Sequence, residues 1–339
     1  MSLLSSITDF LQALRGTNPT PLPDPSPPPT LTNKWIIITG SNNGVGLEAC
    51  KLFAKWGANL LLACREQPPS WELTPASAVE TCKDLAVAHG HTSTIEAWPL
   101  DLADFGSVEA FAKRWLLSGR VLDVLVNNAG IAADQGEETG DGFRVIYQVN
   151  FLSQTLLTLH LLPSLSRANN PRILCTTSCS HHFGIFDLDT LEPKQKQQQQ
   201  RKGTNDYGNS KLFLQMWVAE LQRRLDNHLE YNHITINGLH PGFVETGIWE
   251  GLRSVGKMSA GVAGLVRWFS VTARQGGLAV AVVAVGLEGK EGGGKYFNRV
   301  WEARAKFWSQ DLEARGRLWG KVDEVLDLRE KGLLGGLGG

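Results

Sequence analysis

Tyr207 and Lys211 form the first pair of side chains whose types and spacing suggest chemistry. They stand four positions apart, and residues at this spacing face the same side of a helix. A free phenol has a pKa of about 10, and a neighbouring cation stabilises the phenolate and lowers that pKa. Tyr207 can therefore exchange a proton with a substrate oxygen, and Ser178 can hydrogen-bond the same oxygen. Taken alone, the pair also fits an ordinary solvated helix face.

A glycine-rich segment supplies a candidate site for a dinucleotide. It follows an apolar run and has the pattern T-G-x-x-x-G-x-G, with residues Thr39, Gly40, Ser41, Asn42, Asn43, Gly44, Val45 and Gly46. Glycines permit a tight strand-to-helix turn, and the N–H groups that open the helix bind a pyrophosphate. A chain with 36 glycines also produces such spacings by chance, so an ordinary turn is the alternative. The predicted strand before it and helix after it favour cofactor binding.

The end of the second predicted strand bears on which dinucleotide is bound. An acidic residue there accepts hydrogen bonds from the ribose of NAD(H), whereas an arginine neutralises the 2′-phosphate of NADP(H). Cys64 and Arg65 occupy this place and the acid is absent, although Glu66 follows directly. We therefore expect NADP(H) to be preferred over NAD(H), with Arg65 on the phosphate. A solvent-exposed Arg65 without such a role is the alternative.

Alternating strands and helices must position these groups. Apolar runs predict strands at 35–39, 59–63, 121–126, 172–176 and 234–239. Amphipathic segments predict helices at 46–56, 107–117, 143–161 and 207–225. This alternation predicts an α/β fold, a doubly wound parallel sheet of the Rossmann type with helices on both faces.

The chain organisation predicts a single catalytic domain with an N-terminal extension. Residues 1–33 comprise an amphipathic helix over the first 16 positions and a proline-rich linker, which we expect to be extended and solvated. The catalytic domain then spans 34–325, and a glycine-rich tail spans 326–339. Because every motif lies after Lys34, we expect roughly the first 30 residues to be dispensable for folding and chemistry. The glutamine-rich piece at 194–202 is expected to be a surface loop.

Composition excludes several classes of protein. The 339 residues are 42% apolar and carry a net charge of −1, so we expect no nucleic-acid partner. The five cysteines are an odd number without a C-x-x-C pair, which favours a reducing compartment over a disulfide framework or a zinc ribbon. No secretion signal or long apolar span is visible. We expect a cytoplasmic protein, and the first 16 residues leave peripheral membrane contact open as an alternative to packing on the domain.

Further motifs stand in a fixed order along the chain, and together they resemble one known family. Besides the glycine-rich segment, they are Asp101-Leu102, Asn127-Asn128-Ala129-Gly130, Asn150, Ser178, Tyr207-x-x-x-Lys211 and Pro241-Gly242 with Thr246. From about residue 34 to 325 the chain resembles the short-chain dehydrogenase/reductases, and within them the retinol-dehydrogenase-like group. Two departures are Thr177, where the family usually has serine, and the gap of 29 positions between Ser178 and Tyr207.

The resemblance implies roles for particular residues. The catalytic set would be Asn150, Ser178, Tyr207 and Lys211. Lys211 would also hold the nicotinamide ribose, and Asn150 would position a water that links the lysine to solvent. The implied cofactor-binding set is Gly40, Ser41, Asn42, Asn43, Gly44, Val45, Gly46, Arg65, Asp101, Leu102, Asn128, Ala129, Gly130, Tyr207, Lys211, Pro241, Gly242, Val244 and Thr246.

The segment at about 247–275 lies where the family has its substrate lid. Its apolar residues and few charges predict a bulky lipophilic ketone, aldehyde or secondary alcohol as substrate, with a retinoid-like compound one option by resemblance. Trp249, Trp268 and Phe269 are the candidates there for touching substrate. We expect no metal, because His181 and His182 are adjacent without further ligands at suitable spacing, and interpret them as substrate-loop or surface residues.

Together these features predict an NADP(H)-dependent oxidoreductase that interconverts a carbonyl and an alcohol by hydride transfer. Tyr207 would be its general acid/base. The alternative is a non-catalytic dinucleotide sensor or scaffold, which would be expected to lack the tyrosine or the lysine. A homodimer stays open.

Overall fold

Eight strands form one sheet in the computed structural model of the protein. The structure describes residues 9, 12, 20–26, 29–132, 137–193, 205–244, 270–286 and 292–337. The strands are β1 (Trp35–Thr39), β2 (Asn59–Cys64), β3 (Ile95–Pro99), β4 (Val124–Asn127), β5 (Arg172–Thr176), β6 (Thr235–His240), β7 (Tyr296–Asn298) and β8 (Trp301–Ala303). Their order is β3-β2-β1-β4-β5-β6-β7-β8. All neighbours are parallel except β7 and β8, which are antiparallel.

The strand order reverses at β1, which lies between β2 and β4. Ile36 of β1 is in register with Leu60 of β2 on one side and with Val124 of β4 on the other. All three side chains are buried, as expected for apolar runs covered on both faces. In doubly wound sheets, ligands bind beyond the carboxyl ends of the strands at such a switch point.

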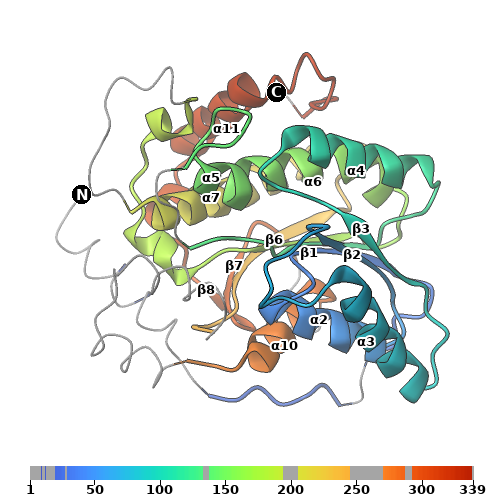
Figure 1. Cartoon of the computed structure of the whole chain (residues 1–339). Helices are drawn as coiled ribbons and strands as arrows, with labels where there is room; N and C mark the ends of the chain where they lie inside the picture. Colours follow the sequence, from blue (N-terminus) through green and yellow to red (C-terminus); the bar gives the residue numbers. More distant parts are fainter. Residues whose placement is uncertain are drawn as a thin grey trace.

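Helices cover both faces of the sheet (Figure 1). One face carries α2 (Gly44–Lys55), α3 (Pro75–Ala88) and α10 (Ala273–Ala284). The other carries α4 (Phe105–Leu117), α6 (Ser153–Leu165) and α7 (Asp206–Asp226), and α11 (Leu312–Leu326) packs on α7. The predicted doubly wound α/β fold is confirmed. In the described part of the chain, no helix is both long and apolar enough to cross a bilayer.

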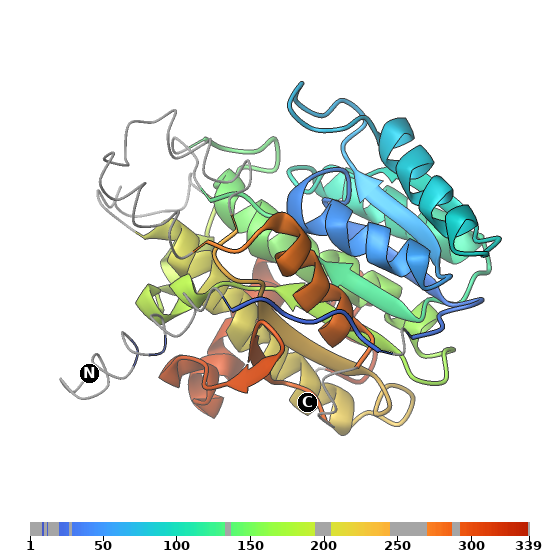
Figure 2. The ribbon, with the colours of Figure 1, turned by 90° about the horizontal axis from the view of Figure 1, so that it is seen from below.

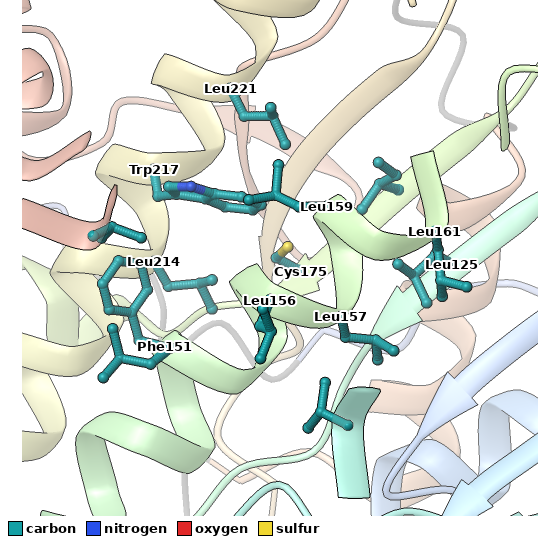
Figure 3. Packing of buried hydrophobic residues seen from close by; sticks show 14 of the residues in the cluster. Leu125, Phe151, Leu156, Leu157, Leu159, Leu161, Cys175, Leu214, Trp217 and Leu221 are labelled. Atoms are coloured by element: carbon teal, nitrogen blue, oxygen red, sulfur yellow. The ribbon is translucent and has the colours of Figure 1, made fainter. Parts of the chain in front are cut away.

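The larger hydrophobic cluster lies between the sheet and the helices α6 and α7 (Figure 3). Leu156 and Leu159 of α6 and Trp217 of α7 pack near Cys175 of β5, and all four are buried. Nearly every side chain of α6 is buried, which explains why its sequence is apolar or small and polar all round. This packing fixes α6 and α7 on one face of the sheet.

The predicted helix at 143–161 is interrupted in the structure. It comprises α5 (Val145–Tyr147), a π-helical turn at Gln148–Leu152 and then α6. The π turn inserts Asn150 on its inner side, where the side chain is fully buried. Single π turns inside helices are frequent at functional sites, because they redirect one side chain without ending the helix.

Most described residues of the proline-rich linker are exposed, as predicted, but one of them packs against the domain. The described linker residues have no helix or strand, but Leu22 is only 7% exposed and belongs to the cluster formed by α2 and α10. The Leu22 N–H donates to Gln275 Oε1 at 2.5 Å, and Gln275 Nε2 donates to the Leu22 carbonyl at 3.1 Å. Asp24 pairs with Arg274 at 2.6 Å. Figure 2 shows this N-terminal segment passing beside α10.

The C-terminal residues also pack against the domain instead of forming a separate tail. Leu328, Leu334 and Leu337 are buried in the same cluster as α7 and α11. The sequence patterns predict no residue range for helices α3, α10 and α11 or for strands β3, β7 and β8. The short length of β7 and β8 explains why no apolar period marked them. All of the glutamine-rich piece at 194–202 and most of the predicted lid lie outside the described residues.

Candidate active site

The glycine-rich segment forms a tight turn between β1 and α2. Gly40 and Gly44 have φ of +63° and +53°, a backbone region that favours glycine. A Cβ on Gly46 would lie 2.2 Å from the Gly40 carbonyl oxygen and 2.5 Å from Asn128 Nδ2. The Asn43 side chain caps α2 by accepting from the Gly44 N–H at 2.7 Å. An anionic group such as a pyrophosphate can therefore come close to the backbone at the positive end of the α2 dipole.

The loop after β4 is tied to this turn. Thr39 Oγ1 accepts from the N–H groups of Asn128 and Ala129 at 2.9 Å and 3.0 Å. Asn128 Nδ2 donates to the carbonyls of Thr39 and Gly40 at 3.0 Å and 3.2 Å. These bonds join the ends of β1 and β4 into one surface at the switch point. Thr39 had been noted only as part of the glycine pattern, yet its hydroxyl makes this junction.

The described cofactor residues that follow β3 and β6 differ in their surroundings. Asp101 is exposed and caps its own turn by accepting from the Ala103 N–H at 2.8 Å, while Leu102 is buried. Gly242 has φ of +101°, and Val244 is buried and pairs with Val271 in a short parallel bridge. Pro241 is described as well, whereas Thr246 lies outside the described residues.

Arg65 lies beside the glycine turn, next to the carboxylate of Glu72. The Gly40 N–H donates to the Ala63 carbonyl at 2.9 Å, which brings the end of β2 next to the turn. Half of the Arg65 side chain is exposed, and its guanidinium lies 3.6 Å from a carboxylate oxygen of Glu72. Sequence reasoning missed Glu72, because an acid in a polar loop carries no period or motif that would single it out.

Asn150 and Lys211 meet at Gly130. A Cβ on Gly130 would lie 3.2 Å from both Asn150 Oδ1 and Lys211 Nζ. Asn150 Oδ1 accepts from the Ile131 N–H, and Asn150 Nδ2 donates to the Ile131 carbonyl, each at 2.8 Å. Lys211 Nζ donates to the Thr176 carbonyl at 2.8 Å. The structure thus brings together side chains separated by 61 positions, at the ends of β4 and β5.

Burial governs the charge state of Lys211. The side chain is only 3% exposed, and desolvation of the ammonium lowers its pKa from 10.5 to about 8. The ammonium is still held by a backbone carbonyl and lies 5.9 Å from the centre of the Tyr207 ring. Tyr207 and Lys211 lie on the same side at the start of α7, as their spacing of four positions predicts.

Ser178 and Tyr207 face one another across the end of β5. Ser178 Oγ accepts from the Ser180 N–H at 3.1 Å, so its own O–H is available to the phenol oxygen. Burial raises the pKa of Tyr207 to about 12, and a hydrogen bond from Ser178 opposes this shift. The expected lowering of the Tyr207 pKa by Lys211 does not occur in this structure, because desolvation of the phenolate outweighs every other contribution.

His181 holds the backbone of Ser178 and is buried, which contradicts the surface location, one of the two alternatives predicted for it. Its ring is fully buried, and the Lys306 N–H donates to Nε2 at 3.2 Å. Nδ1 therefore carries the proton and donates to the Ser178 carbonyl at 2.5 Å. Burial lowers the pKa of His181 well below its usual value, in agreement with a neutral ring. His182 is also buried, and its Nδ1 lies 3.3 Å from Asp9 Oδ1.

A network at the start of α7 fixes the orientation of that helix. Asp206 accepts from the Tyr147 hydroxyl at 2.8 Å and pairs with Arg144 at 2.9 Å. Asn209 Oδ1 accepts from the Ile185 N–H at 2.7 Å. These bonds tie α7 to α5 and to the segment after Ser178. Within the described residues, no group of three or more His, Cys, Asp or Glu side chains is arranged to hold a metal ion.

The residues present fit a dinucleotide. The turn tolerates no side chain at Gly46, its flanking glycines have left-handed backbone, and the ends of β1, β2 and β4 converge there. The proton-exchanging side chains lie further along the same edge, at β4 and β5. The glycine turn and Gly130 would therefore hold a dinucleotide along the edge of the sheet on which Tyr207 and Ser178 lie.

Comparisons with known proteins agree with this geometry. The short chain dehydrogenase family matches residues 34–188. WW domain-containing oxidoreductase of Danio rerio is 32% identical over 88% of this chain and 70% of its own length. Retinol dehydrogenase 13 of Homo sapiens is 30% identical over 88% of this chain and 86% of its own length. Polyprenol dehydrogenase of Mus musculus is 29% identical over 93% and 88%.

Solved structures share the fold at lower identity. A protein of Mycobacterium paratuberculosis superposes with a TM-score of 0.66 at 22% identity, covering 91% of this chain and 98% of that one. L-sorbose reductase of Gluconobacter frateurii, solved with NADPH and L-sorbose, has a TM-score of 0.58 at 19% identity, covering 79% and 95%.

The chain belongs to the short-chain dehydrogenase/reductase family. It is therefore an oxidoreductase that acts on CH–OH groups with a nicotinamide dinucleotide. Its similarity to several retinol dehydrogenases places it in the retinol-dehydrogenase-like group of that family.

Proposed function

We propose that the protein is an NADP(H)-dependent oxidoreductase that interconverts a carbonyl and an alcohol on a lipophilic small molecule, with Tyr207 as general acid/base. The single observation that carries this proposal is the contact between Ser178 and Tyr207 beside the buried Lys211. Ser178 and Tyr207 can act on one substrate oxygen, and Lys211 can stabilise the phenolate of Tyr207. Arg65 beside the glycine turn supports NADP(H), because a guanidinium can pair with a 2′-phosphate.

Each side chain has a defined task in this proposal. When bound, the reduced nicotinamide supplies a hydride to the carbonyl carbon of the substrate. Ser178 donates its O–H to the carbonyl oxygen and orients it, and Tyr207 transfers its phenolic proton to that oxygen as negative charge develops. Lys211 stabilises the resulting phenolate. Asn150 keeps the loop at Ile131 in place beside Lys211 through its paired hydrogen bonds.

The raised pKa of Tyr207 is compatible with a proton donor. A phenol with a pKa of about 12 keeps its proton at neutral pH and can donate it to the oxygen of a carbonyl that is being reduced. In the alcohol-oxidising direction the phenolate must be generated, so positive charge close to Tyr207 becomes necessary. The lysine ammonium supplies this charge.

The substrate class rests on the relatives and on the predicted lid. Retinol dehydrogenase and polyprenol dehydrogenase are named for long, apolar alcohols. The segment at about 247–275 is apolar with few charges, and most of it lies outside the described residues. Peripheral membrane contact through residues 1–16 and a homodimer stay predictions, as does a cytoplasmic location.

Replacement of Tyr207 tests the chemistry. Tyr207→Phe removes one hydroxyl and should lower kcat by about 10² or more, the usual scale for proton transfer, while the Kd for NADPH changes by less than about threefold. Tyr231→Phe is the matched control, because Tyr231 lies beyond the far end of α7. The measurement is NADPH fluorescence with a panel of apolar aldehydes and ketones.

Two results would contradict the proposal. One is turnover by Tyr207→Phe within about threefold of wild type, which would remove the tyrosine from proton transfer. The other is tight NADPH binding by wild type without turnover of any aldehyde or ketone in the panel. That second result would favour a dinucleotide sensor or scaffold.

A further inference from the structure

We propose that Glu72 is a cofactor-specificity residue, which supplies to the end of β2 the carboxylate that the strand itself lacks. In this role Glu72 opposes binding of a 2′-phosphate by Arg65 and accepts hydrogen bonds from an unphosphorylated ribose. The inference rests on the proposed function, because it assumes that a dinucleotide binds at the glycine turn.

Glu72 is held between Arg65 and the glycine turn. One carboxylate oxygen lies 3.6 Å from Arg65 Nη2, and the other accepts from Asn42 Nδ2 at 3.1 Å. Asn42 Nδ2 also donates to the Leu73 carbonyl at 2.9 Å. Both hydrogens of this amide are therefore used to attach the 72–73 segment to the turn.

The exposed fractions of neighbouring side chains show that Glu72 points toward the domain. Asn42 is only 4% exposed and lies inside the turn, and the Glu72 side chain is 19% exposed. The flanking Trp71 and Leu73 are 68% and 40% exposed, so they point away from the domain while Glu72 points into it. The Glu72 carboxylate is thus held in a defined position by its neighbours, whereas Glu66 on the same loop is exposed.

The place of Glu72 is where the two cofactors differ. Thr39 and Ala63 are paired across β1 and β2, so the residues that follow them share one edge. An acid at this edge accepts from the ribose hydroxyls of NAD(H), and it repels the extra phosphate of NADP(H). Arg65 does the opposite, and the two side chains lie close enough to compete for one ligand.

The two charges should therefore partly cancel. The contact at 3.6 Å is longer than a hydrogen bond, and half of the Arg65 side chain is exposed, so its guanidinium can turn toward another anion. The Glu72 carboxylate is less free to move, because it accepts a hydrogen bond from Asn42. A bound 2′-phosphate would then meet Arg65 and an uncompensated carboxylate together.

Two adenosine ligands isolate this effect from catalysis. Adenosine 2′,5′-bisphosphate and adenosine 5′-monophosphate differ only in the 2′-phosphate, and calorimetry gives the Kd of each. Glu72→Gln keeps an oxygen for Asn42 Nδ2 and removes the charge. This substitution should lower the Kd of the bisphosphate about tenfold. The Kd of the monophosphate should stay unchanged or rise by up to about threefold.

Glu66→Gln is the matched control. Glu66 is exposed and directly follows Arg65, so its replacement makes the same change in net charge. Its ratio of the two Kd values should stay within about twofold of wild type, because exposed charges are screened by water and salt. A ratio in Glu72→Gln within twofold of wild type, or equal to that of Glu66→Gln, would overturn the role of Glu72.

The same titrations separate this inference from the proposed function. Wild type that binds neither adenosine ligand nor NADPH would contradict the dinucleotide site and Glu72 together. Normal cofactor binding with unaltered turnover in Tyr207→Phe would contradict only the chemistry. A tenfold effect of Glu72→Gln on the bisphosphate would support the specificity role in that case too.

Discussion

Leu22 joins an N-terminal segment to the core of the domain, and its replacement by alanine tests how far that segment belongs to the fold. Its side chain is 7% exposed and packs in the cluster formed by α2 and α10. Leu22→Ala removes three buried carbon atoms, each worth about 0.8 kcal/mol, and leaves a partial cavity. We expect the free energy of unfolding to fall by about 2–3 kcal/mol.

Deletion of residues 1–30 should cost more than Leu22→Ala. It also removes the backbone groups that bond Gln275 and the carbonyl of Thr20, which accepts from the fully buried Arg299. Loss of a partner for such groups adds about 1–3 kcal/mol. We therefore expect a total loss of about 3–5 kcal/mol, and weaker cofactor binding, because α10 supports α2 and the glycine turn.

Urea unfolding followed by circular dichroism measures this loss, with Leu229→Ala as the control. Leu229 is 94% exposed, so the same substitution there should change the free energy of unfolding by less than about 0.5 kcal/mol. Equal stability of Leu22→Ala and Leu229→Ala would refute the reasoning. Full stability and cofactor affinity after the deletion would restore the view that the first 30 residues are dispensable.

Two further predictions concern the lysine and the glycine beside it. Between pH 8 and 10.5 the unfolded chain binds a proton at Lys211 that the folded chain does not, so this group favours folding increasingly as pH rises. The unfolding free energy of wild type relative to Lys211→Met should thus grow by about 3 kcal/mol across this window, and a constant difference would contradict the burial of the ammonium. Gly130→Ala places a Cβ 3.2 Å from Lys211 Nζ and Asn150 Oδ1 and should lower kcat by about tenfold. Gly140→Ala, with open space around it, should not change kcat, and equal effects at the two glycines would refute the argument.

Local sequence patterns predicted the central elements, and the same patterns together with the family resemblance predicted the type of the site. The apolar runs at β1, β2 and β5 are continuous because these strands are buried on both faces, so their composition identifies them. The spacing of Tyr207 and Lys211 placed both on one helix side without any knowledge of the sheet. Glycines that must adopt left-handed backbone likewise mark the turn at Gly40 and Gly44.

Only the tertiary structure decided which distant groups meet. Leu22 contacts Gln275, 253 positions away, and no pattern in a proline-rich segment indicates such a partner. Glu72 reaches Arg65 through a loop without period, His181 is buried by Lys306, and Asn150 is turned inward by a π-helical turn. The sign of the Tyr207 pKa shift also depends on burial. These features arise from packing between remote segments, whereas sequence periodicity reports only how one segment divides its side chains between core and solvent.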